Sequence, residues 1–168
     1  MHIVAKFTVG SEQGIDLFLQ LKEAQLKEMY KDNVDIEKLN LFMEDELDHR
    51  SAINYLNDIT TQLVIVFGDD KALGYSIIKN AYERPSILKD KKAVKLSLYI
   101  LPEYQNSEVF QSLWQKCLSV TKSYSQWMEV VSTDPLIPFY EDCEFKINTH
   151  SVLPPFQLPS SVLIRDKE

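Results

Sequence analysis

The chain has 168 residues, of which 45% are hydrophobic, and its 18 basic and 25 acidic side chains give a formal net charge of −7. This acidic balance excludes the basic face that binds nucleic acid or anionic membranes, and no apolar run has the length of a membrane span. The first residues lack a signal-peptide pattern, and Cys117 and Cys143 are too few for a disulfide framework or a cysteine zinc site. We therefore expect a single domain over residues 1–168, cytoplasmic and without a metal site.

The first half of the chain is predicted to form a strand, two helical stretches and a hairpin. Ser11 is suited to cap the first helix, and Asp32 or Asn33 the second, which resumes after Leu47. A β-branched apolar run and its return strand flank a turn at residues 68–70. The predicted strands are residues 2–9, 62–67 and 73–79, and the predicted helices are residues 12–30 and a second stretch that starts after its Asp32 or Asn33 cap and reaches Leu56.

The second half is predicted to add four strands and two helices. The strands are residues 94–101, 127–132, 145–152 and 161–166, and the helices are residues 108–124 and a short segment through 137–140. The expected buried stripe of the longer helix is Val109, Leu113, Cys117, Val120 and Tyr124. This order predicts an α+β fold (an α/β three-layer arrangement), in which helices flank a mixed sheet.

The stretch most informative about function is the strand, loop and helix over residues 98–114, LYILPEYQNSEVFQSLW. The free N–H groups of a first helical turn point outwards, and the helix dipole favours negative charge there. A short loop from a strand into a helix therefore predicts a site for a phosphate or another anion.

Two motifs in this half resemble those of the GNAT superfamily of N-acetyltransferases. Residues 98–105, LYILPEYQ, are similar to the family's strand ending in L-Y-V-x-P-E-Y, which precedes a Q/R-x-x-G-x-G/A phosphate loop. Residues 133–145, TDPLIPFYEDCEF, follow the family's N-x-x-A-x-x-F-Y-x-x-x-G-F motif at Phe139, Tyr140 and Phe145. The order of elements also agrees, so the resemblance covers nearly the whole chain and implies a GNAT-like, mostly antiparallel central sheet.

The resemblance implies that acetyl-CoA is the co-substrate and that Tyr140 is catalytic, protonating the leaving thiolate. The pantetheine arm is expected along the strand that ends the first motif, and the pyrophosphate on the loop that follows. The positions expected to contact acetyl-CoA are Leu98, Tyr99, Ile100, Gln105, Asn106, Ser107, Glu108, Val109, Phe110 and Thr133.

The chain departs from the family pattern where glycine normally lets the backbone touch phosphate. Glu108 and Phe110 stand at the two glycine positions of the phosphate loop. In the second motif, Thr133, Leu136 and Glu144 replace the asparagine, the alanine and the late glycine. Glu108 introduces a carboxylate beside the expected phosphates, and the Phe110 ring is large enough to fill the space that glycine leaves.

Three functions follow from these observations. The first is acetyl transfer from acetyl-CoA to a primary amine of a small molecule or a peptide, with a cationic amine favoured by the acidic protein. The second is a degenerate GNAT-fold binding or regulatory module that no longer uses acetyl-CoA. The third is a site reshaped for another acyl-CoA or small ligand.

Three acidic residues are considered as the general base, Glu83, Asp48 and Glu129, and their spacing selects none of them. In the Pro-rich closing region, Val152, Leu153 and Phe156 are expected to be exposed, as in a homodimer contact.

Overall fold

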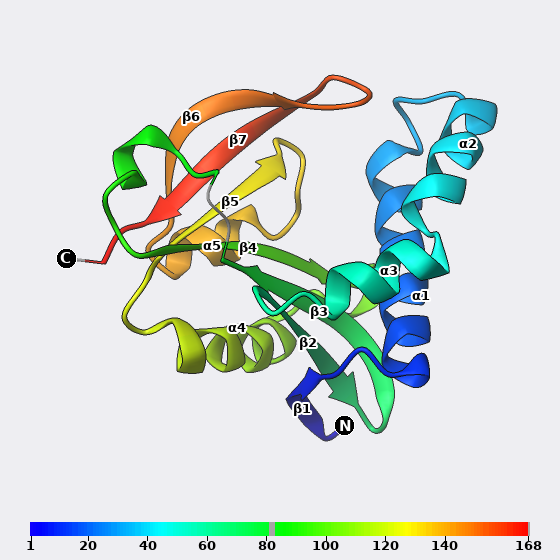
Figure 1. Ribbon diagram of the computed structural model, residues 1–168, viewed down its shortest axis with the longest axis horizontal. Coiled ribbons are helices and arrows are strands. Elements are labelled where there is room, and N and C mark those ends of the chain that lie inside the picture. Colours follow the sequence, from blue (N-terminus) through cyan, green and yellow to red (C-terminus); the bar gives the residue numbers. More distant parts are fainter. Residues whose placement is uncertain (81–82, 168) are drawn as a thin grey trace.

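The computed structural model describes residues 1–80 and 83–167, and these form one twisted sheet with helices on both faces (Figure 1). The sheet has seven strands in the order β1-β2-β3-β4-β5-β7-β6. Neighbouring strands are antiparallel except for β4 and β5, which are parallel. The strands are β1 (Ile3–Thr8), β2 (Thr61–Gly68), β3 (Lys71–Lys79), β4 (Ala93–Ile100), β5 (Ser125–Val131), β6 (Lys146–Leu153) and β7 (Leu158–Arg165).

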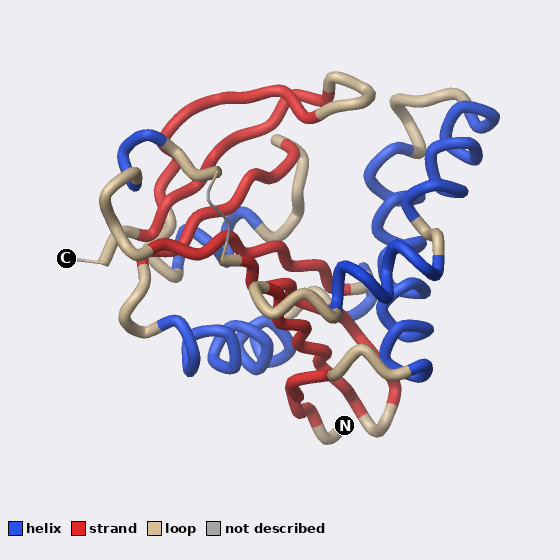
Figure 2. Tube along the Cα trace, viewed as in Figure 1, coloured by secondary structure: helices blue, strands red, loops and turns tan. Residues whose placement is uncertain are grey.

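The helices form two layers, one on each face of the sheet. Figure 2 shows the helices in separate groups on either side of the strands. The first group is α1 (Glu12–Tyr30), α2 (Ile36–Glu46) and α3 (His49–Leu56), and the second is α4 (Ser107–Thr121) and α5 (Ile137–Asp142). Alternate β4 side chains divide between the layers, because Leu96 and Leu98 pack in the core beneath α4 whereas Tyr99 packs in the core beneath α1. The predicted α+β, three-layer class is confirmed.

Helix starts were predicted correctly for α1 but not for α2. The Ser11 hydroxyl accepts a hydrogen bond from the Gly14 N–H at 3.2 Å, as expected of a cap. The second helix begins later than expected, with Asp35 at its N-cap position. The backbone N–H groups of Asn33 and Val34 both donate to the Tyr30 carbonyl, so the chain makes an extra turn before α2 starts.

The buried stripe of α4 differs from the prediction at its C-terminal end. Val109, Leu113 and Cys117 are fully buried as expected, but Val120 is 40% exposed. Because 3.6 residues make a turn, the stripe moves round the helix, and Thr121 takes the buried place that Val120 was expected to fill.

The β6–β7 connection meets the end of α1. Phe156 was expected to be exposed, but its ring packs edge-on against Tyr30, with centroids 5.0 Å apart, and against Phe42, with centroids 5.3 Å apart. These three rings connect the β6–β7 hairpin to helices α1 and α2. The hairpin and the α1–α2 connection approach each other at the top of Figure 1. Val152 is half exposed, as predicted. No helix in the described residues combines the length and apolar character that crossing a membrane requires.

Gly74 allows β3 to lie close against the end of β4. A Cβ at this position would overlap the Tyr99 carbonyl oxygen and lie 2.9 Å from the Ile100 Cα. We expect Gly74→Ala to lower the free energy of unfolding by about 1–3 kcal/mol, because backbone atoms cannot move aside as a flexible side chain can. Gly10→Ala is the control in urea denaturation, since its Cβ would meet the mobile end of Asn57. Equal losses in the two variants would contradict the prediction.

Candidate active site

Strands β4 and β5 pair only at their beginnings and then separate. Their parallel register joins Ala93 to Ser125, and ends where Lys95 lies opposite Trp127. Beyond this point β4 pairs only with β3, and β5 only with β7. The sheet therefore opens between the C-terminal halves of its two central strands.

The backbone of Leu98 faces this opening. On one edge of β4, the Leu101 N–H donates to the Leu73 carbonyl at 2.8 Å, across to β3. On the other edge, the Lys92 carbonyl accepts from the Ser125 N–H at 2.8 Å, across to β5. Polar groups of successive strand residues point to opposite edges, so odd-numbered residues of β4 bond to β3 and even-numbered residues face β5.

Gln105 covers one of the backbone groups that face the opening. Its side-chain Nε2 donates to the Ile100 carbonyl at 2.9 Å. The N–H and carbonyl of Leu98 lie two residues earlier on the same edge, beyond the last residue that pairs with β5. They are free to pair with an extended, peptide-like ligand, as an added strand would be paired.

A cleft of about 480 Å³ passes through the opening. Tyr99 belongs to the core on the α1 side of the sheet, whereas Leu98 and Leu136 belong to the core beneath α4, so the cleft reaches from one face of the sheet to the other. The residues that line it are Gln25, Glu28, Met29, Lys31, Asp32, Asn33, Leu98, Tyr99, Gln105, Val131, Thr133, Asp134, Pro135 and Leu136.

Two tyrosines of the sheet hold the α1 wall of the cleft in place. The Tyr75 hydroxyl donates to Oε1 of Gln25, and the Tyr99 hydroxyl donates to Oε2 of Glu28 at 3.2 Å. Burial, and then the charge of Glu28, raise the pKa of Tyr99 above its ordinary value, so this hydroxyl remains a donor across the range of ordinary assays. The sheet therefore fixes the position of the Glu28 carboxylate.

Asp134 lies opposite Glu28 in the cleft, on the loop that follows β5. Its Oδ1 accepts a hydrogen bond from the Leu136 N–H at 2.8 Å, and this bond closes a tight turn of the loop. Burial raises the pKa of Asp134 to about 6, and the negative charge of Glu28 contributes to the same shift. Asp134 therefore keeps its proton to a higher pH than an ordinary aspartate.

The start of α4 lies at the end of the loop that begins with Gln105. Oδ1 of Asn106 caps the helix by accepting from the Val109 N–H at 3.0 Å. The N–H groups of Ser107 and Glu108, one residue and two residues into the helix, have no acceptor within it. The Glu108 side chain is exposed to solvent.

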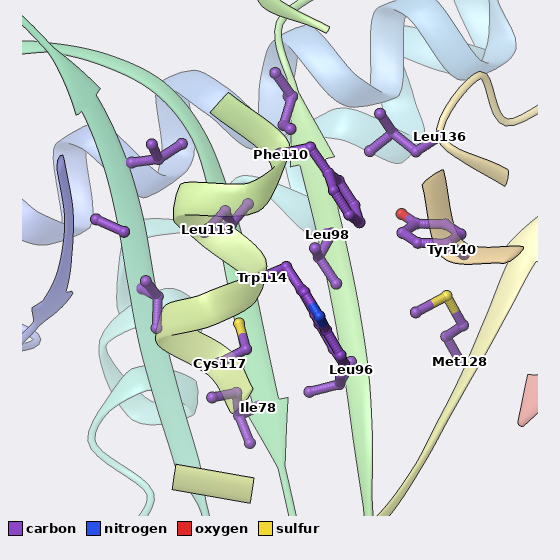
Figure 3. Packing of buried hydrophobic residues seen from close by; sticks show 14 of the residues in the cluster. Ile78, Leu96, Leu98, Phe110, Leu113, Trp114, Cys117, Met128, Leu136 and Tyr140 are labelled. Atoms are coloured by element: carbon purple, nitrogen blue, oxygen red, sulfur yellow. The ribbon is translucent and has the colours of Figure 1, made fainter. Parts of the chain in front are cut away.

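Phe110 and Tyr140 fill the space between α4 and α5. Phe110 is fully buried and stacks on Phe139, with centroids 5.0 Å apart, and the Tyr140 ring centroid lies 5.9 Å from that of Phe110. Figure 3 shows the Tyr140 hydroxyl directed away from α5 and towards Phe110. This hydroxyl has no hydrogen-bond partner among the described residues, although Tyr140 is only 1% exposed. An unpaired hydroxyl in such a place costs about 1–3 kcal/mol of folding free energy.

The structure brings only part of the expected site together. Leu98, Tyr99, Gln105 and Thr133 line the one cleft. Ile100, Val109, Phe110 and Tyr140 are buried beside it, whereas Asn106, Ser107 and Glu108 are exposed at the start of α4.

The three acidic residues considered as bases lie outside the cleft lining. Asp48, for example, caps α3 by accepting from Ser51. The acidic side chains that do line the cleft, Glu28 and Asp134 among them, were missed. Asp134 has a weak sequence signal, because it directly follows a strand, where ligand-binding residues gather. Glu28 has none, since a glutamate on an amphipathic helix resembles any solvated position.

No protein-family model matches the sequence, and no curated protein matches it. Solved structures do match. The PaiA N-acetyltransferase of Thermoplasma acidophilum, in complex with coenzyme A, superposes with a TM-score of 0.71 at 13% identity, covering 96% of this chain and 98% of the other. A GCN5-related N-acetyltransferase of Rhodopseudomonas palustris gives 0.70 at 10% identity, covering 99% and 97%. An aminoglycoside N(6')-acetyltransferase of Legionella pneumophila gives 0.65 at 15% identity, covering 98% and 92%.

Each match covers nearly the whole length of both chains, and the fold is shared although the sequence identity is low. Structural similarity at such low identity shows a shared arrangement of strands and helices. It does not identify the substrates, which depend on the site. The arrangement of strands and helices described above is therefore one that solved structures also have. This chain has the fold of the GNAT superfamily of N-acetyltransferases.

Proposed function

We propose that this protein is an N-acetyltransferase that moves an acetyl group from acetyl-CoA directly to a primary amine. The observation that carries this proposal is the unpaired Leu98 backbone beside the cleft. The pantetheine arm of coenzyme A contains amide groups, which suit strand-like pairing with a free N–H and carbonyl. The Leu98 N–H also lies where it would polarise a thioester carbonyl.

The start of α4 is the proposed phosphate site. The free N–H groups of Ser107 and Glu108 and the positive end of the helix dipole favour an anion there. Because the Glu108 carboxylate is exposed, its repulsion of a phosphate is screened by water and amounts to about 1 kcal/mol at 4 Å. A helix end with free N–H groups outweighs a penalty of that size.

The proposed acceptor is a small cationic amine. Glu28, Asp32 and Asp134 contribute carboxylates to the cleft lining, and Lys31 contributes its one cation among the described residues. This excess of negative charge attracts an ammonium group and repels an acid. The wall opposite, at Leu98 and Leu136, is apolar and accommodates a methyl or methylene group.

Tyr140 is the proposed acid. When the amine nitrogen bonds to the acetyl carbon, the carbon–sulfur bond breaks and the thiolate needs a proton. The Tyr140 hydroxyl is protonated, has no partner among the described residues, and lies beside Phe110 in the core that also contains Leu98. A buried thiolate is itself a stronger base than one in water, so proton transfer from a phenol becomes easier.

A degenerate module without acetyl-CoA is the second candidate, and one observation favours it. The stacked rings of Phe110 and Phe139 fill the space between α4 and α5, where the family has a small residue at the position of Phe110. On this alternative the rings block the cofactor path, and the cleft serves another ligand.

Titration of the protein with acetyl-CoA by calorimetry distinguishes the two candidates. We expect saturable binding, and we expect Glu108→Gln to tighten it about five-fold at low salt, because removing a charge worth about 1 kcal/mol changes affinity by that factor. The gain should shrink as salt screens the charge.

Glu37→Gln is the matched control, since Glu37 is also an exposed glutamate in a first helical turn, that of α2. It should leave the affinity unchanged. No binding by the wild type at millimolar acetyl-CoA would contradict the transferase and favour the degenerate module.

A further inference from the structure

Asp134 has one carboxylate oxygen committed to the protein and one that is free. Oδ1 is held by the Leu136 N–H at 2.8 Å, and this bond fixes the orientation of the carboxylate. Oδ2 accepts no hydrogen bond from any described residue, while the side chain lines the cleft. The free oxygen therefore faces space that a ligand can enter.

The surroundings of this carboxylate are rich in negative charge. From α1, Glu28 raises its pKa, and Asp32, with the cation Lys31, lines the same cleft just after the end of α1. From β4, the Tyr99 hydroxyl bonds to Glu28 and so keeps that charge in place. From α5, the neutral Tyr140 hydroxyl lies close enough for Asp134 to raise its pKa. Asp134 is thus a carboxylate that gains from accepting a proton.

We infer that Asp134 is the catalytic base that takes the proton from the acceptor ammonium, and that Glu28 is a positioning residue that draws the ammonium in and makes Asp134 the stronger base. This inference rests on the proposed acetyl transfer. It extends that proposal by naming the group that makes the amine nucleophilic, which no motif in the sequence identifies.

In the proposed step, the acceptor ammonium gives one proton to Oδ2 of Asp134 and becomes a neutral amine with a free electron pair. That pair forms the new carbon–nitrogen bond, the carbon–sulfur bond breaks, and its electrons leave on sulfur. The thiolate takes a proton from Tyr140, which regains one from the nitrogen as the amide forms. Asp134 then releases its proton to water, so one proton is released for each acetyl group transferred.

The other acidic groups of the cleft are less suited to this role. Oε2 of Glu28 already accepts the Tyr99 hydrogen bond, which holds that carboxylate against β4. Asp32 is exposed to solvent, whereas Asp134 is partly buried in the cleft wall. A base works best when its pKa lies near the working pH, and burial raises the pKa of Asp134 to about 6.

The test compares Asp134→Asn with the wild type on two kinds of acceptor. The amide keeps the size of the side chain and can keep the bond to Leu136. The cationic probes are n-butylamine and putrescine, and the uncharged probe is hydroxylamine, which is largely neutral at neutral pH. We expect the variant to lose about 10²–10³-fold in kcat/KM on the cationic amines. It should lose far less on hydroxylamine, and acetyl-CoA affinity should not change.

The pH profile provides a second readout. The carboxylate form of Asp134 is the active one, so wild-type kcat/KM should fall as the pH drops through about 6. This acid limb should disappear in Asp134→Asn and move to lower pH in Glu28→Gln, because removing a negative charge weakens the base. Asp142→Asn, an exposed aspartate at the end of α5, is the control and should behave as the wild type.

A third measurement needs no acceptor. A ¹³C carboxyl titration of the acetyl-CoA complex should show a signal with a midpoint near pH 6 that is absent from Asp134→Asn. An ordinary aspartate midpoint would overturn the inference. So would full activity of Asp134→Asn on cationic amines, or an equal loss on all three probes, which would mean a structural role. In those cases acetyl-CoA binding by the wild type would still leave the proposed function intact, whereas absent binding would remove both.

Discussion

Tyr140→Phe is expected to make the protein more stable and less active. Removing a buried hydroxyl that has no partner among the described residues should raise the free energy of unfolding by about 1 kcal/mol, because the desolvation cost of that group disappears. The same hydroxyl is the proposed acid for the thiolate, so kcat should fall about 10²-fold while acetyl-CoA affinity stays unchanged. Urea denaturation and steady-state kinetics measure the two effects independently.

The acid role also predicts how Tyr140 responds to pH. Burial, and then the charge of Asp134, raise the pKa of the Tyr140 hydroxyl well above its ordinary value. The hydroxyl therefore keeps its proton through the alkaline range, and the wild type should show no loss of activity there from this group.

Tyr55→Phe is the control, since Tyr55 is a partly exposed tyrosine on α3, outside the cleft lining. It should leave kcat unchanged. If Tyr140→Phe were stabilised but retained full kcat, the unpaired hydroxyl would have no catalytic role, and another group or water would protonate the thiolate.

Phe110→Ala is expected to be among the most destabilising single changes in this chain. Its ring is fully buried in the core that also contains Leu98, Leu113 and Tyr140, and it stacks on Phe139. Truncating such a ring leaves a cavity and should lower the free energy of unfolding by about 3–5 kcal/mol in urea denaturation. A loss below about 1 kcal/mol would mean that neighbouring side chains collapse into the space.

Phe110→Leu distinguishes packing from obstruction of the cofactor path. It keeps much of the volume, so it should cost less than about 1.5 kcal/mol and remain folded. If the protein is an acetyltransferase, as proposed, the wild type and this variant should bind acetyl-CoA with similar affinity. Binding that occurs only once the stacked ring is removed would show that Phe110 and Phe139 close the site, as the degenerate module requires.

Much of the fold can be read from local patterns in this sequence. The β-branched apolar run and its return strand on each side of residues 68–70, the Ser11 cap and the stripe of Val109, Leu113 and Cys117 all depend on near neighbours, and all are present in the structure. Errors arose where a local pattern had competing solutions. The start of α2 shifted because the chain turned once more on the Tyr30 carbonyl, and Val120 lost its buried place to Thr121.

The candidate site divides in the same way. Leu98 and Gln105 could be identified because they belong to a strand and a loop that match the first motif, and Thr133 because it stands at the asparagine position of the second motif. The proposed base could not be identified, because Glu28 and Asp134 are more than a hundred residues apart and meet only across the opening between β4 and β5. Their proximity depends on where two central strands stop pairing, which no short segment of the chain encodes.

Burial was likewise decided by the tertiary structure. The sequence indicates that a tyrosine stands at position 140 and an aspartate at position 134, but not that one hydroxyl lacks a partner among the described residues and one carboxylate is desolvated. Those properties come from the layers packed above and below the sheet. Local periodicity thus specified which elements form, whereas the long-range packing of those elements set the protonation chemistry of the cleft.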